Sequence, residues 1–78
     1  MSIEEFVSKL EAEFEDMPKG TLKPETDYRS IKGWSSMHAL IIIAFVDIHF
    51  NITLSGSDLK STQTVQDLYN LIQQKTQA

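Results

Sequence analysis

An uninterrupted apolar run, residues 39–46, lies in the middle of this chain and limits its possible folds more than any other feature. These eight residues are far too few to cross a bilayer, which takes about 20. The Ile and Val side chains would also suit a strand, but the length and spacing of the apolar pattern favour a helix from residue 36 to about residue 49. We therefore expect the fold to be built around this helix.

The predicted central helix has two apolar faces when its residues are projected at about 100° each. The first face contains Ala39, Ile42, Ile43, Val46 and Phe50. The second face, which lies nearly opposite, contains Met37, Ile41, Ala44 and Ile48. A small domain buries one such face in its core, so we expect the second face to be exposed or to be covered by a partner.

Length and composition restrict the class of protein. The chain is long enough for one small domain, residues 1–78, and too short for two separate cores. It contains no cysteine, so any thiol chemistry needs a thiol from outside the chain. Seven basic and eleven acidic residues give a net charge of −4, which argues against a nucleic-acid partner. Because the N-terminus shows no basic-then-apolar signal peptide, we expect a soluble cytoplasmic protein without a membrane span.

A first helix is predicted at the N-terminus. The sequence Ser2-Ile3-Glu4-Glu5 indicates a capping box, and apolar residues then recur at helical spacing to about residue 15. Its acidic residues are expected to form a solvated face, which contains Glu4, Glu5, Glu11 and Glu13.

A long loop and two further helices are predicted around the central helix. Residues 16–33 contain several helix breakers and no sustained period, so we expect a loop that is anchored by Leu22, Tyr28 and Ile31. Residues 57–60 fit a short turn of helix with Leu59 buried. A last helix is expected to begin with Thr62 or Thr64 as its cap and to fray near residue 75.

Ser36 is the side chain with the clearest chemical potential. The start of a helix offers unpaired N–H groups and partial positive charge, so a hydroxyl at this point is well placed to carry a phosphodiester. Ser35 or Ser36 would also serve simply as a helix cap. His38 and His49 are about 16 Å apart along a helix and cannot share a metal. We therefore predict no metal site. Because Ser36 and His38 also point apart, they cannot form a pair of nucleophile and base. We predict no catalytic residue and no enzymatic activity.

The stretch Trp34-Ser35-Ser36-Met37, placed after a long loop and before an apolar helix, resembles the acyl carrier protein family. The signature of that family is Asp-Ser-Leu, often preceded by Trp, at the opening of its second helix. Ser35-Ser36-Met37 stands at that place. Residues 22–31, 50–54 and 64–68 are also similar to the corresponding segments of the family, so the resemblance covers essentially the whole chain.

The resemblance implies an all-α fold, a small four-helix bundle with a short third helix and a long first loop. Ser36 would receive 4′-phosphopantetheine from a phosphopantetheinyl transferase, and the thiol of this arm would hold acyl groups as thioesters. Acyl-loading and condensing enzymes of fatty-acid-like or specialised polyketide-like synthesis would then be the partners. An external thiol fits a chain that has no cysteine of its own.

Two features of the sequence, one residue and one helix face, depart from the family pattern. Ser35 replaces an Asp whose carboxylate is thought to help bind a metal ion while the arm is transferred. The face of the central helix that is usually acidic has Asp47 as its only acid. We therefore expect partners to contact an apolar surface with less salt dependence than usual, through Trp34, Ser35, Met37, Ile41 and Ile48.

Two other functions stay open at this point. The first is an aminoacyl carrier of the D-alanyl or peptidyl kind, which the Met after Ser36 does not exclude. The second is an unmodified interaction module that keeps the fold without the arm, as Ser35 in place of Asp suggests. Weak self-association through the second apolar face would also explain that face.

Overall fold

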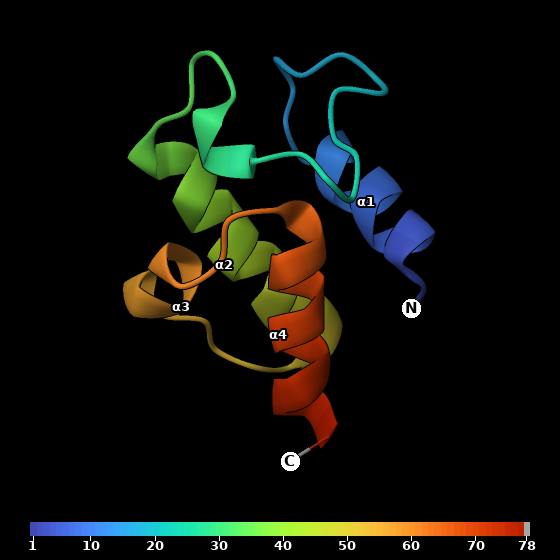
Figure 1. Ribbon diagram of the computed structural model, residues 1–78, viewed down its shortest axis with the longest axis vertical. Coiled ribbons are helices and arrows are strands. Elements are labelled where there is room, and N and C mark those ends of the chain that lie inside the picture. Colours follow the sequence, from blue (N-terminus) through green and yellow to red (C-terminus); the bar gives the residue numbers. More distant parts are fainter. Residues whose placement is uncertain (78) are drawn as a thin grey trace.

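A computed structural model describes residues 1–77 of the chain as four α-helices joined by loops, with one 3₁₀ turn (Figure 1). The helices are α1 (Ile3–Ala12), α2 (Ser36–Phe50), α3 (Gly56–Lys60) and α4 (Val65–Gln77), and the 3₁₀ turn η1 spans Tyr28–Ser30. The prediction of an all-α fold with four helices, a short third helix and a long first loop is therefore confirmed for this part of the chain. Within it, no helix has the length and apolar character needed to span a membrane.

The core is formed where α1, α2 and α4 meet. Phe6 of α1 is completely buried. The centroid of its ring lies 5.8 Å from the ring centroid of Phe45, 6.0 Å from that of Phe50 and 5.5 Å from that of Tyr69. Phe45 falls between the two apolar faces predicted for α2, so its burial was not predicted. The buried apolar residues are Phe6, Leu10, Phe14, Leu22, Tyr28, Ile42, Phe45, Val46, Leu54, Leu59, Val65, Leu68 and Ile72.

Helix α1 begins where it was predicted, with the Ser2 hydroxyl accepting the backbone N–H of Glu5 at 3.1 Å. The other half of the predicted capping box, a bond from the Ser2 N–H to the Glu5 carboxylate, does not form in the described part of the chain. It ends at Ala12, earlier than predicted, because the chain turns there and directs the Phe14 ring into the core. The prediction that Glu11 belongs to a solvated face is wrong. Its buried carboxylate accepts the backbone N–H groups of Gly20 at 2.9 Å and Leu22 at 2.8 Å, and so holds the loop against α1.

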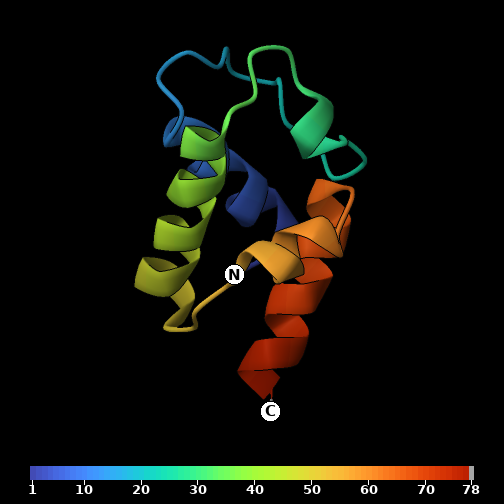
Figure 2. The same cartoon turned by 90° about the vertical axis from the view of Figure 1, so that its left-hand side faces the viewer.

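The long loop, residues 13–35, crosses one end of the molecule and is fastened to the start of α4 (Figure 2). The backbone N–H groups of Val65 and Gln66 donate to the loop carbonyls of Thr26 at 3.0 Å and Pro24 at 2.8 Å. These bonds satisfy N–H groups that have no acceptor within their own helix. The predicted anchors Leu22 and Tyr28 are buried, and Ile31 is half-buried.

Thr64 caps helix α4, which settles the choice between Thr62 and Thr64. The Thr64 hydroxyl accepts the N–H of Asp67 at 3.0 Å, and the Asp67 carboxylate accepts the N–H groups of Thr64 and Gln63, each at 3.2 Å. Thr62 is buried instead, and its hydroxyl is hydrogen-bonded to that of Tyr28, which also donates to the carbonyl of Leu59 at 3.0 Å.

The Asp67 cap predicts how stability depends on pH. The backbone N–H groups of Thr64 and Gln63 lower the pKa of the Asp67 carboxyl. This carboxylate therefore stabilises the fold above the ordinary aspartate value of about 3.9, and the contribution is lost as pH falls through the lower folded-state pKa. In urea titrations between pH 6 and pH 3, Asp67→Asn should weaken the fold at pH 6 and make the loss of stability on acidification shallower. The same acid dependence in Asp67→Asn as in the native chain would contradict this, and Glu4→Gln, at an exposed acid of α1, is the control.

Candidate functional site

Ser36 is the first residue of α2, and its side chain is exposed. Its hydroxyl makes no hydrogen bond within residues 1–77. The carbonyl of Ser35 accepts the backbone N–H groups of His38 at 3.0 Å and Ala39 at 3.4 Å. The backbone N–H groups of Ser36 and Met37 have no acceptor in the same part of the chain. A free hydroxyl therefore stands beside two free N–H donors at the positive end of a 15-residue helix.

Ser35, and not Ser36, is the cap of α2. Its backbone N–H donates to Nδ1 of His38 at 3.2 Å, and its hydroxyl lies 3.0 Å from the same nitrogen. Because Nδ1 accepts the backbone N–H, the proton of the neutral imidazole is assigned to Nε2, which faces Asp16 Oδ2 at 3.6 Å. Sequence reasoning missed this contact, although the three-residue spacing of a capping box pointed to it. His38 thus completes the cap and leaves Ser36 unengaged.

Aromatic rings hold the first turn of α2 against the rest of the domain. The Trp34 ring lies 5.6 Å from that of Tyr28 and 5.1 Å from that of His38. Phe14 stacks on His38 with 5.3 Å between the ring centroids. Gly33 precedes Trp34 with φ of 84°, a left-handed conformation that glycine adopts without strain. Trp34 is half-buried and packs against this end of the core, so only part of its ring is open to a partner.

A cavity of about 340 Å³ opens between the end of α1 and the start of α2. We call it the α1–α2 cavity. It begins at the residue after Ser36, and its lining combines apolar and acidic side chains: Glu13, Phe14, Glu15, Asp16, Met37, His38 and Ile41. The sequence did not predict this cavity, because it exists only where residues 13–16 turn alongside α2.

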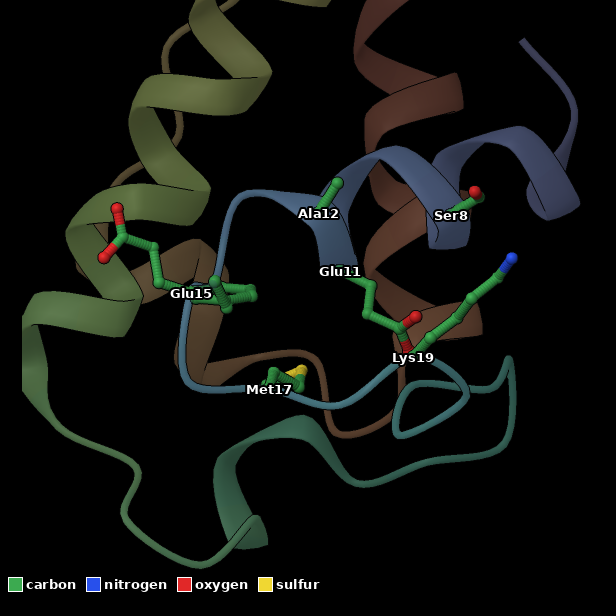
Figure 3. Close-up of a pocket in the computed structure, with 7 residues that line it drawn as sticks. Ser8, Glu11, Ala12, Glu15, Met17 and Lys19 are labelled. Atoms are coloured by element: carbon green, nitrogen blue, oxygen red, sulfur yellow. The ribbon is translucent and has the colours of Figure 1, made fainter.

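A second cavity, of about 370 Å³, lies beside α1 and the loop (Figure 3). In Figure 3 the side chain of Glu11 extends from α1 towards the loop, that of Lys19 extends from the loop towards the side of Ser8, and that of Glu15 extends to the side of α2. The Glu11 carboxylate is already occupied by the backbone N–H groups of Gly20 and Leu22. This cavity does not include Ser36 or its neighbours, so we place the candidate site at the start of α2.

The exposed face of α2 continues from Ser36 along the helix. Met37 is 68% exposed and Ile48 is 78% exposed, in agreement with the predicted second face. Ile41, predicted on that face, is half-buried and packs against the core, whereas Leu40, which was not predicted, is 64% exposed. The exposed α2 face is therefore defined by Met37, Leu40, Ala44 and Ile48.

The second histidine of α2, His49, does not line the α1–α2 cavity. His49 stacks on Phe45 with 4.4 Å between the ring centroids, well along α2 from His38. No group of three or more His, Cys, Asp or Glu side chains in this part of the chain is arranged to hold a metal ion.

Comparison with protein-family models, with curated proteins and with solved structures gives no significant match. The function proposed below is therefore inferred from the residues of this chain, in particular from Ser36 and its surroundings.

Proposed function

We propose that the protein carries acyl intermediates as thioesters on a 4′-phosphopantetheine arm attached to the Ser36 hydroxyl. The observation that carries this proposal is the state of Ser36, which is exposed, free of hydrogen bonds within residues 1–77 and placed at the first turn of α2. A phosphodiester at this oxygen would lie beside the free N–H groups of Ser36 and Met37. Helix starts with free donors favour phosphate groups for this reason.

Two further features support a carrier. The chain has no cysteine, so the reactive sulfur would arrive with the arm. The order of elements, with a long loop before α2 and a short α3 before α4, matches the four-helix arrangement that the sequence resemblance implies. Such a domain would present the arm while partner enzymes carry out the chemistry, and we assign no catalytic residue within it.

The proposed partners are a phosphopantetheinyl transferase and acyl-loading and condensing enzymes. Each of them must approach Ser36, and the exposed α2 face is the surface that begins beside it. Because its exposed side chains are mainly apolar, we propose that these enzymes dock mainly through apolar contact, with weak dependence on salt.

Loading by coenzyme A tests the proposal directly. After incubation with coenzyme A and a broad-specificity transferase, the intact mass should rise by one phosphopantetheine. Ser36→Ala should abolish this gain completely, because it removes the acceptor oxygen. Ser35→Ala should still gain the mass of one phosphopantetheine, because Ser35 caps the helix and is not the proposed acceptor of the arm. Circular dichroism should show that each variant is folded.

The Ser35 position provides a second measurement in the same assay. Aspartate is also a good helix cap, and the family resemblance implies that a carboxylate here helps metal binding during transfer. Ser35→Asp should therefore load faster than the native chain with a standard transferase. If several transferases add no mass to the native chain or to Ser35→Asp, the carrier proposal is wrong. The protein would then be assigned the alternative function of an unmodified interaction module.

A further inference from the structure

We propose that His38 is a positioning residue for transfer of the arm to Ser36, and that only its neutral ring holds the first turn of α2 fully capped. This inference rests on the proposed function, in which Ser36 accepts the arm. It adds a regulation of that site, because the rate of transfer falls when His38 takes up a proton.

The His38 ring is fixed by its neighbours. It stacks on Phe14 with 5.3 Å between the ring centroids and lies 5.1 Å from the Trp34 ring. Its side chain is only 14% exposed, and Nε2 lies 3.6 Å from Asp16 Oδ2. The ring therefore connects α2 both to the turn that follows α1 and to the end of the long loop.

Nδ1 of His38 accepts the backbone N–H of Ser35, at 3.2 Å, only while this nitrogen carries no proton. In the charged ring both nitrogens are donors, so the Ser35 N–H loses its acceptor. The charge also lies within the first turn of α2, where the positive end of the helix disfavours a cation. Protonation therefore weakens the cap of the helix that begins with Ser36.

The charged groups around the ring determine what the protonated form gains. Those that line hollows together with His38 are Glu13, Glu15, Asp16 and Lys32. Within residues 1–77, only the Asp16 carboxylate lies within 4.0 Å of a ring nitrogen. A charged ring is attracted to this carboxylate through Nε2, while Nδ1 no longer holds the helix cap. Protonation thus transfers His38 from the cap of α2 to the turn at residues 13–16.

The state of the cap reaches Ser36 through the backbone. Ser36 follows Ser35 directly, and its hydroxyl makes no hydrogen bond within residues 1–77 that would fix it in another way. The free N–H groups of Ser36 and Met37 point along the helix only while its first turn is formed. Because transfer requires a well-placed acceptor, a loosened turn should slow it. His38 acts through Ser35 and does not touch the acceptor oxygen.

Nuclear magnetic resonance of the unmodified protein tests the structural step without a transferase. Ring ¹⁵N shifts of His38 should show an unprotonated Nδ1 at about pH 8 and protons on both nitrogens at about pH 5, the range in which histidine titrates. The Ser35 amide resonance should move with the same midpoint as the ring. His38→Gln, which keeps a side-chain acceptor at this capping-box position and does not titrate, should abolish the movement. A neutral ring protonated on Nδ1, or a Ser35 amide that does not follow the ring, would overturn the inference.

The rate of loading tests the consequence for transfer. The ratio of kcat/KM for the native chain to kcat/KM for His38→Gln cancels the titration of the transferase. This ratio should fall at least about threefold between pH 8 and pH 5.5, as the loss of one hydrogen bond implies. His49→Gln, at the exposed second histidine of α2, should keep the native pH profile. A constant ratio would overturn the inference. Absence of loading at every pH would contradict the proposed function instead, and the Ser35 amide, measured without a transferase, distinguishes the two failures.

Discussion

Glu11→Ala is expected to lower the free energy of unfolding by about 3 kcal/mol, because hydrogen bonds to charged groups contribute about 1.5–3 kcal/mol each. The substitution removes both acceptors of the Gly20 and Leu22 N–H groups and leaves the buried Leu22 N–H without a partner. A domain of this length has a total stability of roughly 4–12 kcal/mol. The loss should therefore move the urea midpoint strongly.

Hydrogen exchange separates this effect from a general weakening of the helix. Loss of the Glu11 carboxylate should accelerate exchange at the amides of Gly20 and Leu22 well before the core amides of α4 are affected. Glu11→Gln retains one side-chain carbonyl and should lose roughly half as much stability as Glu11→Ala. Glu4→Ala, at an exposed acid on the same helix, should change stability by less than about 0.5 kcal/mol. Equal effects of Glu4→Ala and Glu11→Ala would contradict the proposed role of the buried carboxylate.

Glu11 also shows which parts of this fold are accessible to sequence reasoning. The starts of α1 and α4 were predicted because a cap and its partner lie within three residues of each other, as Ser2 with Glu5 and Thr64 with Asp67. The donors that bury Glu11 lie nine and eleven residues away, in a loop that has no periodic pattern. Only the packed chain brings them together.

The same distinction applies to the candidate site. Ser36 was singled out from sequence because a helix start is a local feature, and the structure places α2 from that residue onward. The α1–α2 cavity could not be predicted, since it depends on the chain leaving helix at Ala12 and turning Phe14 and Asp16 towards α2. Phe45 was missed for a related reason, because its burial depends on where Phe6 of α1 lies.

Leu40→Glu and Ile48→Glu are expected to lower kcat/KM for transfer of the arm to Ser36 at least tenfold each, which corresponds to about 1.4 kcal/mol of lost docking energy. Both side chains are largely exposed on the α2 face, so a new charge there meets the partner and not the core. Thermal unfolding should show little change. The assay is the rate at which a phosphopantetheinyl transferase adds mass to each variant.

Two controls make the docking prediction specific to this surface. Gln74→Glu adds the same charge at an exposed position of α4 and should leave the transfer rate near that of the native chain. Ile42→Glu places the charge at a residue that is 1% exposed and should unfold the domain. Ile41 is not a clean test position, because it is half-buried and packs against the core.

The salt dependence of the transfer rate identifies the nature of the contact. Docking through Met37, Leu40, Ala44 and Ile48 buries apolar surface, whose contribution is not screened by ions, so the native rate should vary little between low and physiological ionic strength. A steep fall with salt would show that acids such as Glu13 and Asp47 steer the partner instead. Unchanged kcat/KM in folded Leu40→Glu and Ile48→Glu would exclude the α2 face as the docking surface. Unfolding of both variants would show that these side chains belong to the core.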